Sequence, residues 1–186
     1  MIDPEQVNER LTFAKQRLEE LEKINIKYGD LAGAEGAYKQ QLIQEFFFHI
    51  VSAIDFLAQL VNDSKNLGIN IEYVTVREVC KQLPSGDKIR ILLENLHPET
   101  KGKNLPQDPY SEEGSHFRII LMRNIVCHQD MVGFSILVIV PGPPKTRLFI
   151  DPKYPNKGGS KKLVVDELNE FWDLVNDKCH KVLKLL

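Results

Sequence analysis

The 186-residue sequence lacks the patterns that define metalloproteins, disulfide-bonded proteins and several enzyme classes. Its three cysteines, Cys80, Cys127 and Cys179, are far apart and form no C-x-x-C pair. This argues against a disulfide framework and against a cysteine zinc site. The histidines show no metal-ligand spacing, and the motifs H-E-x-x-H, G-x-S-x-G and G-x-G-x-x-G are absent. We therefore expect no metal and no cofactor.

The sequence also lacks a long apolar run and a strong net charge of either sign. Its apolar runs are too short to span a membrane, and its first residues do not resemble a signal peptide. A formal net charge of −2, with 42% hydrophobic and 27% charged residues, is typical of soluble globular proteins. These features predict one cytoplasmic domain over residues 1–186, with no membrane partner. Any nucleic-acid surface must then be a local patch.

Apolar residues recur at three- and four-residue spacing in three long stretches, which predicts three long amphipathic helices. The first is expected over 3–26, with Asp3 and Gln6 in a capping box, the second over 37–62 and the last over 163–185. Their core faces are expected to comprise Val7, Leu11, Ala14, Leu18 and Leu21, then Ile43, Phe47, Ile50, Ile54, Leu57 and Val61, then Leu168, Phe171, Val175, Cys179 and Val182. Phe48 and Phe56 fall outside this stripe, which leaves them available for a subunit contact.

Shorter elements connect these helices. Brief helices are expected after Thr75 and after Ser85 or Asp87, and the alternation of apolar residues over 69–73 indicates an extended segment. Residues 97–110 form the longest predicted loop. The runs 134–140 and 146–150 are typical of strands joined by a Pro-rich turn. The predicted fold class is all-α, a helical bundle with a β-hairpin and basic loop (133–162) inserted before the C-terminal helix.

The chemistry-bearing stretch is the segment from Arg123 to His128, which follows an apolar run from Phe117. A helix that is apolar on all sides is expected to be enclosed, inside the domain or between subunits. Polar groups there must satisfy one another or a ligand. Asn124 and His128 are four residues apart and share a helix face, whereas Arg123 lies about 140° from His128. Its long side chain, or a loosened last turn near Asp130, would bring the guanidinium to the same pocket.

This Arg-Asn-x-x-x-His arrangement resembles the R-x4-H signature of the HEPN family (higher eukaryotes and prokaryotes nucleotide-binding). Arg90 and His97 form a second pair with a six-residue spacer, but it has no adjacent Asn and lies early in the chain. The resemblance implies a small helical bundle, often dimeric through the motif helix. It also implies either a metal-independent endoribonuclease or a non-catalytic binding module. Some family toxins carry a Tyr two residues after the His, where this sequence has Asp130.

The resemblance assigns roles to three residues in RNA cleavage by a 2′-OH group. His128 is expected to act as base or acid, because an imidazole transfers protons near neutral pH. Arg123 is expected to clamp the phosphate with its fork of donors, and Asn124 to orient the imidazole. The alternative is structural: Arg123 pairs with a carboxylate and His128 caps the helix C-terminus. Asp55 either anchors Arg123 or is an exposed acid.

A basic segment precedes the last helix. Its cations are Lys145, Arg147, Lys153, Lys157, Lys161 and Lys162, with Asp151 as the only counter-charge. The segment either tracks an RNA backbone through salt-dependent contacts or is simply solvated.

Three functions remain open on the sequence. The leading one is a homodimeric, metal-independent endoribonuclease of HEPN type in a toxin or defence system, with RNA as substrate and a protein antitoxin as a further partner. The second is a non-catalytic module that binds nucleotide, RNA or protein. The third is a purely structural helical dimer.

Overall fold

The structure is a computed structural model that describes residues 3–28, 36–97, 106, 108–127, 134–137, 145–148 and 162–186. For 25–28, 125–127 and the two strands it describes the backbone only. In order, the elements are α1 (Pro4–Tyr28), α2 (Gly36–Ser64), the 3-10 helix η1 (Ile71–Tyr73), α3 (Val76–Gln82), α4 (Lys88–Leu96), α5 (Glu112–Cys127), β1 (Phe134–Leu137), β2 (Lys145–Leu148) and α6 (Val164–Leu183). Most described residues are helical, which confirms the expected all-α class.

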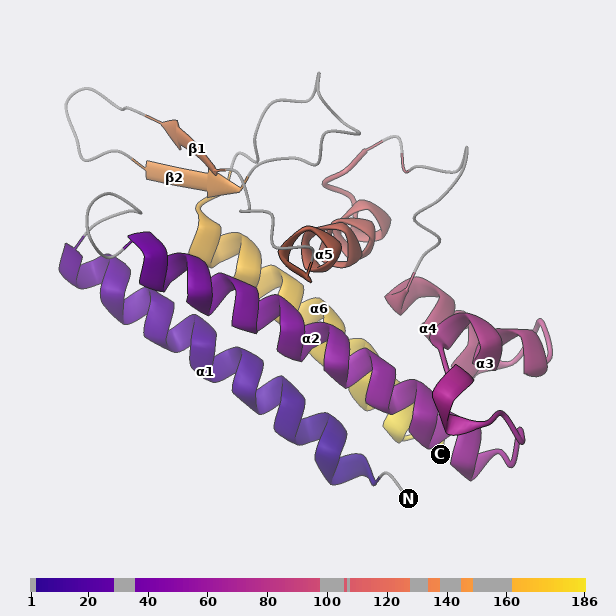
Figure 1. The fold of residues 1–186 in the computed structure, drawn as a ribbon. Helices are drawn as coiled ribbons and strands as arrows, with labels where there is room; N and C mark the ends of the chain where they lie inside the picture. Colours follow the sequence, from indigo (N-terminus) through magenta and orange to yellow (C-terminus); the bar gives the residue numbers. More distant parts are fainter. Residues whose placement is uncertain are drawn as a thin grey trace.

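Three long helices, α1, α2 and α6, lie side by side and form the body of the protein (Figure 1). Every residue assigned to their core faces from the sequence spacing is buried, with at most 2% of its surface exposed. Burial of large apolar side chains at about 1.5–3 kcal/mol each is the main favourable term for such a bundle. Trp172 on α6 also donates from Nε1 to the Leu11 carbonyl on α1 at 2.9 Å. The periodicity of the sequence therefore predicted the core correctly.

Side-chain caps fix where the helices begin. The Asp3 carboxylate accepts from the Glu5 and Gln6 amides at 2.8 and 3.1 Å, and Gln6 Oε1 accepts from the Asp3 amide at 3.2 Å, which confirms the capping box. Asp87, rather than Ser85, caps α4, because its Oδ1 accepts from the Ile89 amide at 2.7 Å. Thr75 caps α3 by accepting from the Glu78 amide at 3.2 Å.

The extended segment expected over 69–73 is wrong, because residues 71–73 form η1. The Asn62 side chain bonds both to the Ile69 amide and to the Ile69 carbonyl, each at 3.0 Å. These bonds use the backbone groups that a strand partner would need. Asn70 then caps η1 by accepting from the Glu72 amide. The alternating apolar residues Ile71 and Tyr73 are consequently exposed rather than buried on one face.

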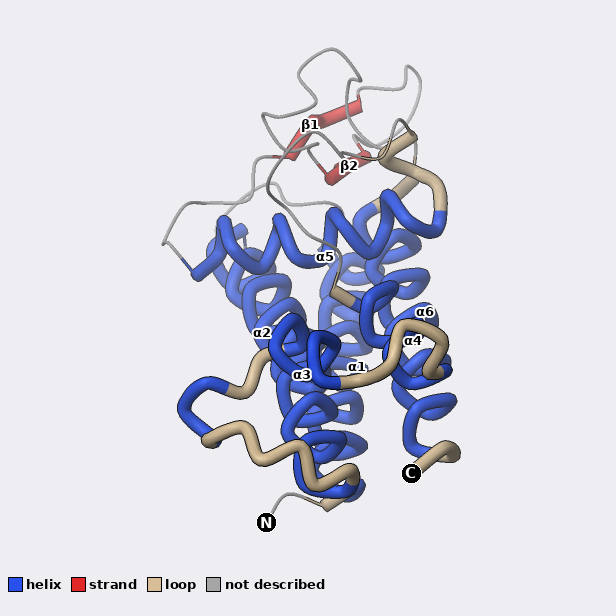
Figure 2. The backbone as a smooth tube through the Cα atoms, turned by 90° about the vertical axis from the view of Figure 1, so that its right-hand side faces the viewer, coloured by secondary structure: helices blue, strands red, loops and turns tan. Residues whose placement is uncertain are grey.

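Helix α5, which carries Arg123 and Asn124, runs across the long helices at one end of the bundle (Figure 2). Its side chains from Phe117 to Met122 are all buried, as expected for a helix that is apolar around its circumference. The burial takes place within a single chain, against α2, α4 and α6. The apolar residues of this part of α5 are therefore already covered without a second subunit.

The two short strands pair antiparallel, with Phe134 opposite Leu148 and Leu137 opposite Lys145. They lie at the end of the bundle where α6 begins (Figure 1). The turn between them and the basic loop after them fall outside the described residues. The hairpin as a whole therefore stays a prediction.

One described helix, α2, is long and apolar enough to cross a membrane by length and composition alone. Of its most apolar window, 56% is buried inside the protein. A core helix of a soluble protein passes the same test, so this finding is weak evidence for a membrane segment.

Candidate functional site

Arg123 and Asn124 lie on the last described turn of side chains in α5, where burial gives way to partial exposure. Arg123 Nη1 donates to Asn124 Oδ1 at 3.2 Å. The preceding residues of α5, from Phe117 to Met122, are buried, so the guanidinium is presented from a helix that packs into the core. Because one amide oxygen uses only part of its donor fork, Arg123 keeps donors for an anion.

Two further charged groups lie near Arg123, from other helices. Asp55 is half-buried on α2, and His97 follows the last turn of α4. Burial raises the pKa of Asp55, and the nearby charges of Arg123 and His97 oppose that rise. Burial also lowers the pKa of His97; Asp55 acts against this shift, whereas Arg123 reinforces it. An interior position of α2, the residue after α4 and the last turns of α5 thus bring a carboxylate, an imidazole and a guanidinium close enough for their charges to interact.

His97 is the residue of this group that the sequence reasoning set aside. It belonged to the Arg90–His97 pair, which was passed over in favour of Arg123 and His128. The interpretation of Asp55 as an anchor for Arg123 gains support, because Asp55 is half-buried and its carboxylate feels the Arg123 charge. Only the angle at which α4 meets α5 places His97 here, and periodicity does not encode that angle.

The remaining predicted site residues are not brought to this group by the described structure. His128 lies outside the described residues, as do Lys153, Lys157 and Lys161. Lys145 and Arg147 are on β2, whose backbone alone is described, opposite Leu137 and Ser135. Lys162 is described, and its ammonium pairs with the Glu170 carboxylate at the start of α6. Its role in RNA binding stays a prediction.

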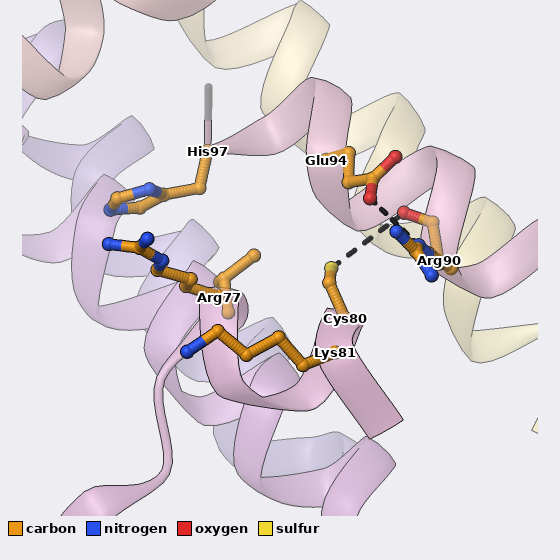
Figure 3. A pocket seen from close by; sticks show the side chains of 7 residues that line it. Arg77, Cys80, Lys81, Arg90, Glu94 and His97 are labelled. Atoms are coloured by element: carbon orange, nitrogen blue, oxygen red, sulfur yellow. Dashed lines mark hydrogen bonds and ion pairs between the residues drawn. The ribbon is translucent and has the colours of Figure 1, made fainter. Parts of the chain in front are cut away.

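A cavity of about 370 Å³ opens between α3 and α4 beside this group (Figure 3). His97 lines it together with Arg77, Lys81, Arg90 and Glu94. Arg90 is fixed in place, because Nε donates to Glu94 at 2.8 Å and Nη1 donates to the Leu83 carbonyl at 3.0 Å. Arg90 and His97, the two residues of the alternative sequence pair, therefore line one cavity.

Helix α5 also carries buried polar groups that the sequence reasoning missed. Arg118 pairs with Glu167 of α6 inside the protein, and each side chain is only 2% exposed. The Arg118 guanidinium lies over the rings of Tyr110 and Phe171, at 5.1 and 5.4 Å from their centroids. An arginine in the middle of an apolar run was the available signal, the same one that drew attention to Arg123.

The described residues contain no group of three or more His, Cys, Asp or Glu side chains arranged to hold a metal ion. Comparisons with protein-family models, curated proteins and solved structures found no match to this chain. The chemistry of the site therefore has to be argued from its own residues. Arg123 offers donors matched to phosphate oxygens, and His97 is an imidazole that can exchange a proton.

Proposed function

We propose that this protein is a metal-independent endoribonuclease of the HEPN type, cleaving RNA by attack of a 2′-OH on the adjacent phosphate. The observation that carries the proposal is the half-buried Arg123–Asn124 pair, with Asp55 and His97 close by, at the meeting point of α2, α4 and α5. In the sequence, His128 follows Asn124 by four residues. Guanidinium and imidazole groups supply what this reaction needs.

The reaction can be assigned to these residues step by step. A base takes the proton of the 2′-OH while its oxygen bonds to phosphorus, and Arg123 binds the non-bridging phosphate oxygens. The bond from phosphorus to the 5′-oxygen breaks as an acid protonates that oxygen, leaving a 2′,3′-cyclic phosphate and a 5′-OH. His128 is assigned to one proton transfer. The second imidazole is either His97 of the same chain or His128 of a second copy.

With His97 as the second imidazole, a single chain supplies both proton-transfer groups. Its lowered pKa keeps it neutral at neutral pH, the form that accepts a proton. Asp55 near it favours the imidazolium formed after that transfer. The dimer implied by the HEPN resemblance would instead pair two motif helices. Because the apolar side chains from Phe117 to Met122 are covered within one chain, the described part of that contact would rest on Arg123 and Asn124.

The test is incubation of the purified protein with single-stranded RNA in EDTA. Cyclic-phosphate ends are expected from the wild type, none from His128→Ala, and a loss of at least about a hundredfold from Arg123→Ala. His180→Ala is the matched control, because this exposed histidine on α6 forms its described hydrogen bond within its own helix, at the Asn176 carbonyl. Cleavage that survives in His128→Ala, or that vanishes in EDTA, would exclude the assignment. Full activity of His97→Gln would assign the second proton transfer to His128 of a second copy of the chain.

A binding module without catalysis is the second candidate. It is favoured by the fact that Asn124 Oδ1 accepts from Arg123, which diverts part of this amide from orienting His128. In that case the anion would be held by Arg123 and released intact. Arg123→Ala would then weaken binding of a labelled oligonucleotide, while no variant and no wild-type preparation would yield cyclic-phosphate ends.

A cytoplasmic role in a toxin or defence system, with a protein antitoxin, belongs to the same proposal. Expression of the wild type should then arrest growth of a host cell, whereas His128→Ala should not. Arrest by both forms would separate toxicity from RNA cleavage.

A further inference from the structure

The cavity between α3 and α4 combines positive charge with an apolar floor. It is about 370 Å³ in volume, within the range of small-ligand sites. Val76 and Cys80 form its apolar part. Arg77, Lys81 and Arg90 contribute permanent cations, and Glu94 is the only carboxylate among the described residues that line it. A cavity with this excess of positive charge favours an anionic ligand.

The cations approach the cavity from two sides (Figure 3). Arg77 and Lys81 are one turn apart on α3, and their side chains extend toward the same side as His97. Arg90 stands on α4 at the opposite wall, held by Glu94 and by the Leu83 carbonyl. Lys81 pairs with Glu78 on the surface of α3. Exposed pairs of this kind contribute little free energy, so an incoming anion can recruit the ammonium.

The Cys80 thiol at the floor is unreactive at neutral pH. Burial raises its pKa to about 11, so it remains protonated there. The cavity therefore has the features of a binding site and no activated nucleophile among its described lining residues. Its ligand is expected to be held by charge and shape.

His97 connects this cavity to the candidate catalytic site. The imidazole lines the cavity, and it also feels the charges of Asp55 and Arg123. His97 follows the last turn of α4, and α4 contacts α5, the helix that carries Arg123. A ligand in the cavity and a phosphate bound at Arg123 would therefore both lie near His97. When single-stranded nucleic acid is bound by one phosphate, the next phosphates along the strand are the anions closest to that site. One of them can therefore occupy a cationic cavity beside it.

We infer that the α3–α4 cavity is a subsite for a backbone phosphate of single-stranded RNA, one that flanks the phosphate to be cleaved. The inference rests on the proposed function, because it makes the cavity and Arg123 two parts of one RNA path. Arg77 and Lys81 hold the phosphate from α3, Arg90 supports it from α4, and the ribose packs on Val76 and Cys80.

The test compares the double variant Arg77→Gln/Lys81→Gln with Lys181→Gln/Lys184→Gln. Both variants remove two exposed positive charges, and Lys181 pairs with Asp177 on its own helix much as Lys81 pairs with Glu78. The first readout is the affinity for a fully 2′-O-methylated single-stranded oligonucleotide, which has no 2′-OH to attack with. The second is kcat and KM for cleavage of the matching RNA.

The subsite predicts that the cavity variant binds the oligonucleotide about tenfold more weakly at low salt, with a salt slope smaller by about 1. The control variant should stay within about twofold of the wild type, since distant charges are screened. KM for RNA should rise with the same factor, while kcat stays unchanged. Equal affinities for the two double variants, or no binding of the oligonucleotide by the wild type, would overturn the subsite.

The outcomes separate this inference from the proposed function. If the cavity variant binds more weakly and the wild type cleaves no RNA, the phosphate subsite is supported and the ribonuclease assignment is excluded. Cleavage by the wild type with unchanged KM and affinity in the cavity variant would keep the nuclease and remove the subsite. Titration with inorganic phosphate, followed by the shift of its ³¹P resonance, tells whether the cavity takes a free phosphate as well as a backbone one. A shift lost in the cavity variant supports anion binding there, whereas a shift retained in that variant counts against it.

Discussion

The Arg118 guanidinium and the Glu167 carboxylate form an ion pair between α5 and α6 in which each side chain is only 2% exposed. The pair joins the helix that carries the motif to the C-terminal helix. Two aromatic rings, from Tyr110 and Phe171, cover the guanidinium. Removing two charges from water is costly, so the pair is stable only while both partners are present.

Removal of one partner of this pair should destabilise the fold strongly. Glu167→Gln is expected to lower the free energy of unfolding by about 3–5 kcal/mol, because the Arg118 charge is left buried without a carboxylate. The double variant Arg118→Met/Glu167→Leu should recover most of that loss, since neither charge remains to be buried. Urea unfolding followed by Trp172 fluorescence measures both. Glu170→Gln, at an exposed pair with Lys162, is the control and should cost less than about 1 kcal/mol.

Gly114 is the position where the turn before α5 lies against the helix. A Cβ added there would lie 2.3 Å from the Asp108 carbonyl oxygen and 2.5 Å from the Pro109 carbonyl carbon. Gly114→Ala is therefore expected to destabilise the protein by about 1–3 kcal/mol, although alanine is the better helix former by about 1 kcal/mol. Gly86→Ala is the matched control, because its Cβ would meet no atom within 4 Å. Equal thermal midpoints for the two variants would contradict the tight packing of this turn.

His116 should make the protein less stable as the pH falls. Its side chain is buried, and both ring nitrogens lack a hydrogen-bond partner among the described residues. Burial and then the Lys178 charge lower its pKa from 6.5 to about 4, against the opposing effect of Glu112. Between these two values the unfolded chain binds a proton that the folded protein does not. The free energy of unfolding therefore falls as the pH drops through this window.

The measurement is the difference between the wild type and His116→Phe, which keeps an aromatic ring but cannot be protonated. The two proteins should be about equally stable at pH 7.5, and the variant should gain about 2 kcal/mol relative to the wild type at pH 5. Comparing them pairwise cancels the other titrating groups. A constant difference between the two proteins across this range would rule out the buried neutral imidazole.

The long helices could be predicted because the spacing of their apolar residues is repeated in every turn. The residues at three- and four-residue spacing in α1, α2 and α6 all face the core, and the Asp3 capping box fixes the first helix start. The prediction of an extended segment over residues 69–73 was wrong because so short an alternation of apolar residues does not distinguish a strand from other structures. The local structure is set by the side-chain amide of Asn62, which bonds to the backbone of Ile69 seven residues later. A pattern of alternating apolar residues does not include this contact.

The site was predicted only in part, because it depends on how helices cross. The sequence singled out Arg123 and Asn124 as polar groups at the end of an apolar run, but it expected Asn124 to orient His128 and did not foresee that Asn124 Oδ1 accepts from Arg123. His97 was set aside, since its proximity to Arg123 requires the end of α4 to meet α5. Arg118 and Glu167 are 49 positions apart in the sequence, and nothing local to either residue reveals the other.

Helices α1 and α6 are joined by hydrogen bonds, with Lys15 Nζ donating to Asn169 Oδ1 at 3.0 Å and Trp172 donating to the Leu11 carbonyl at 2.9 Å. These contacts join residues 154 and 161 positions apart. In a growing polypeptide, α1 and α2 are therefore synthesised long before α6 leaves the ribosome. Until then the apolar faces that α6 will cover stay open to water, to chaperones and to other nascent chains. The slowest and most vulnerable stage of biogenesis should accordingly be the wait for residues 164–183.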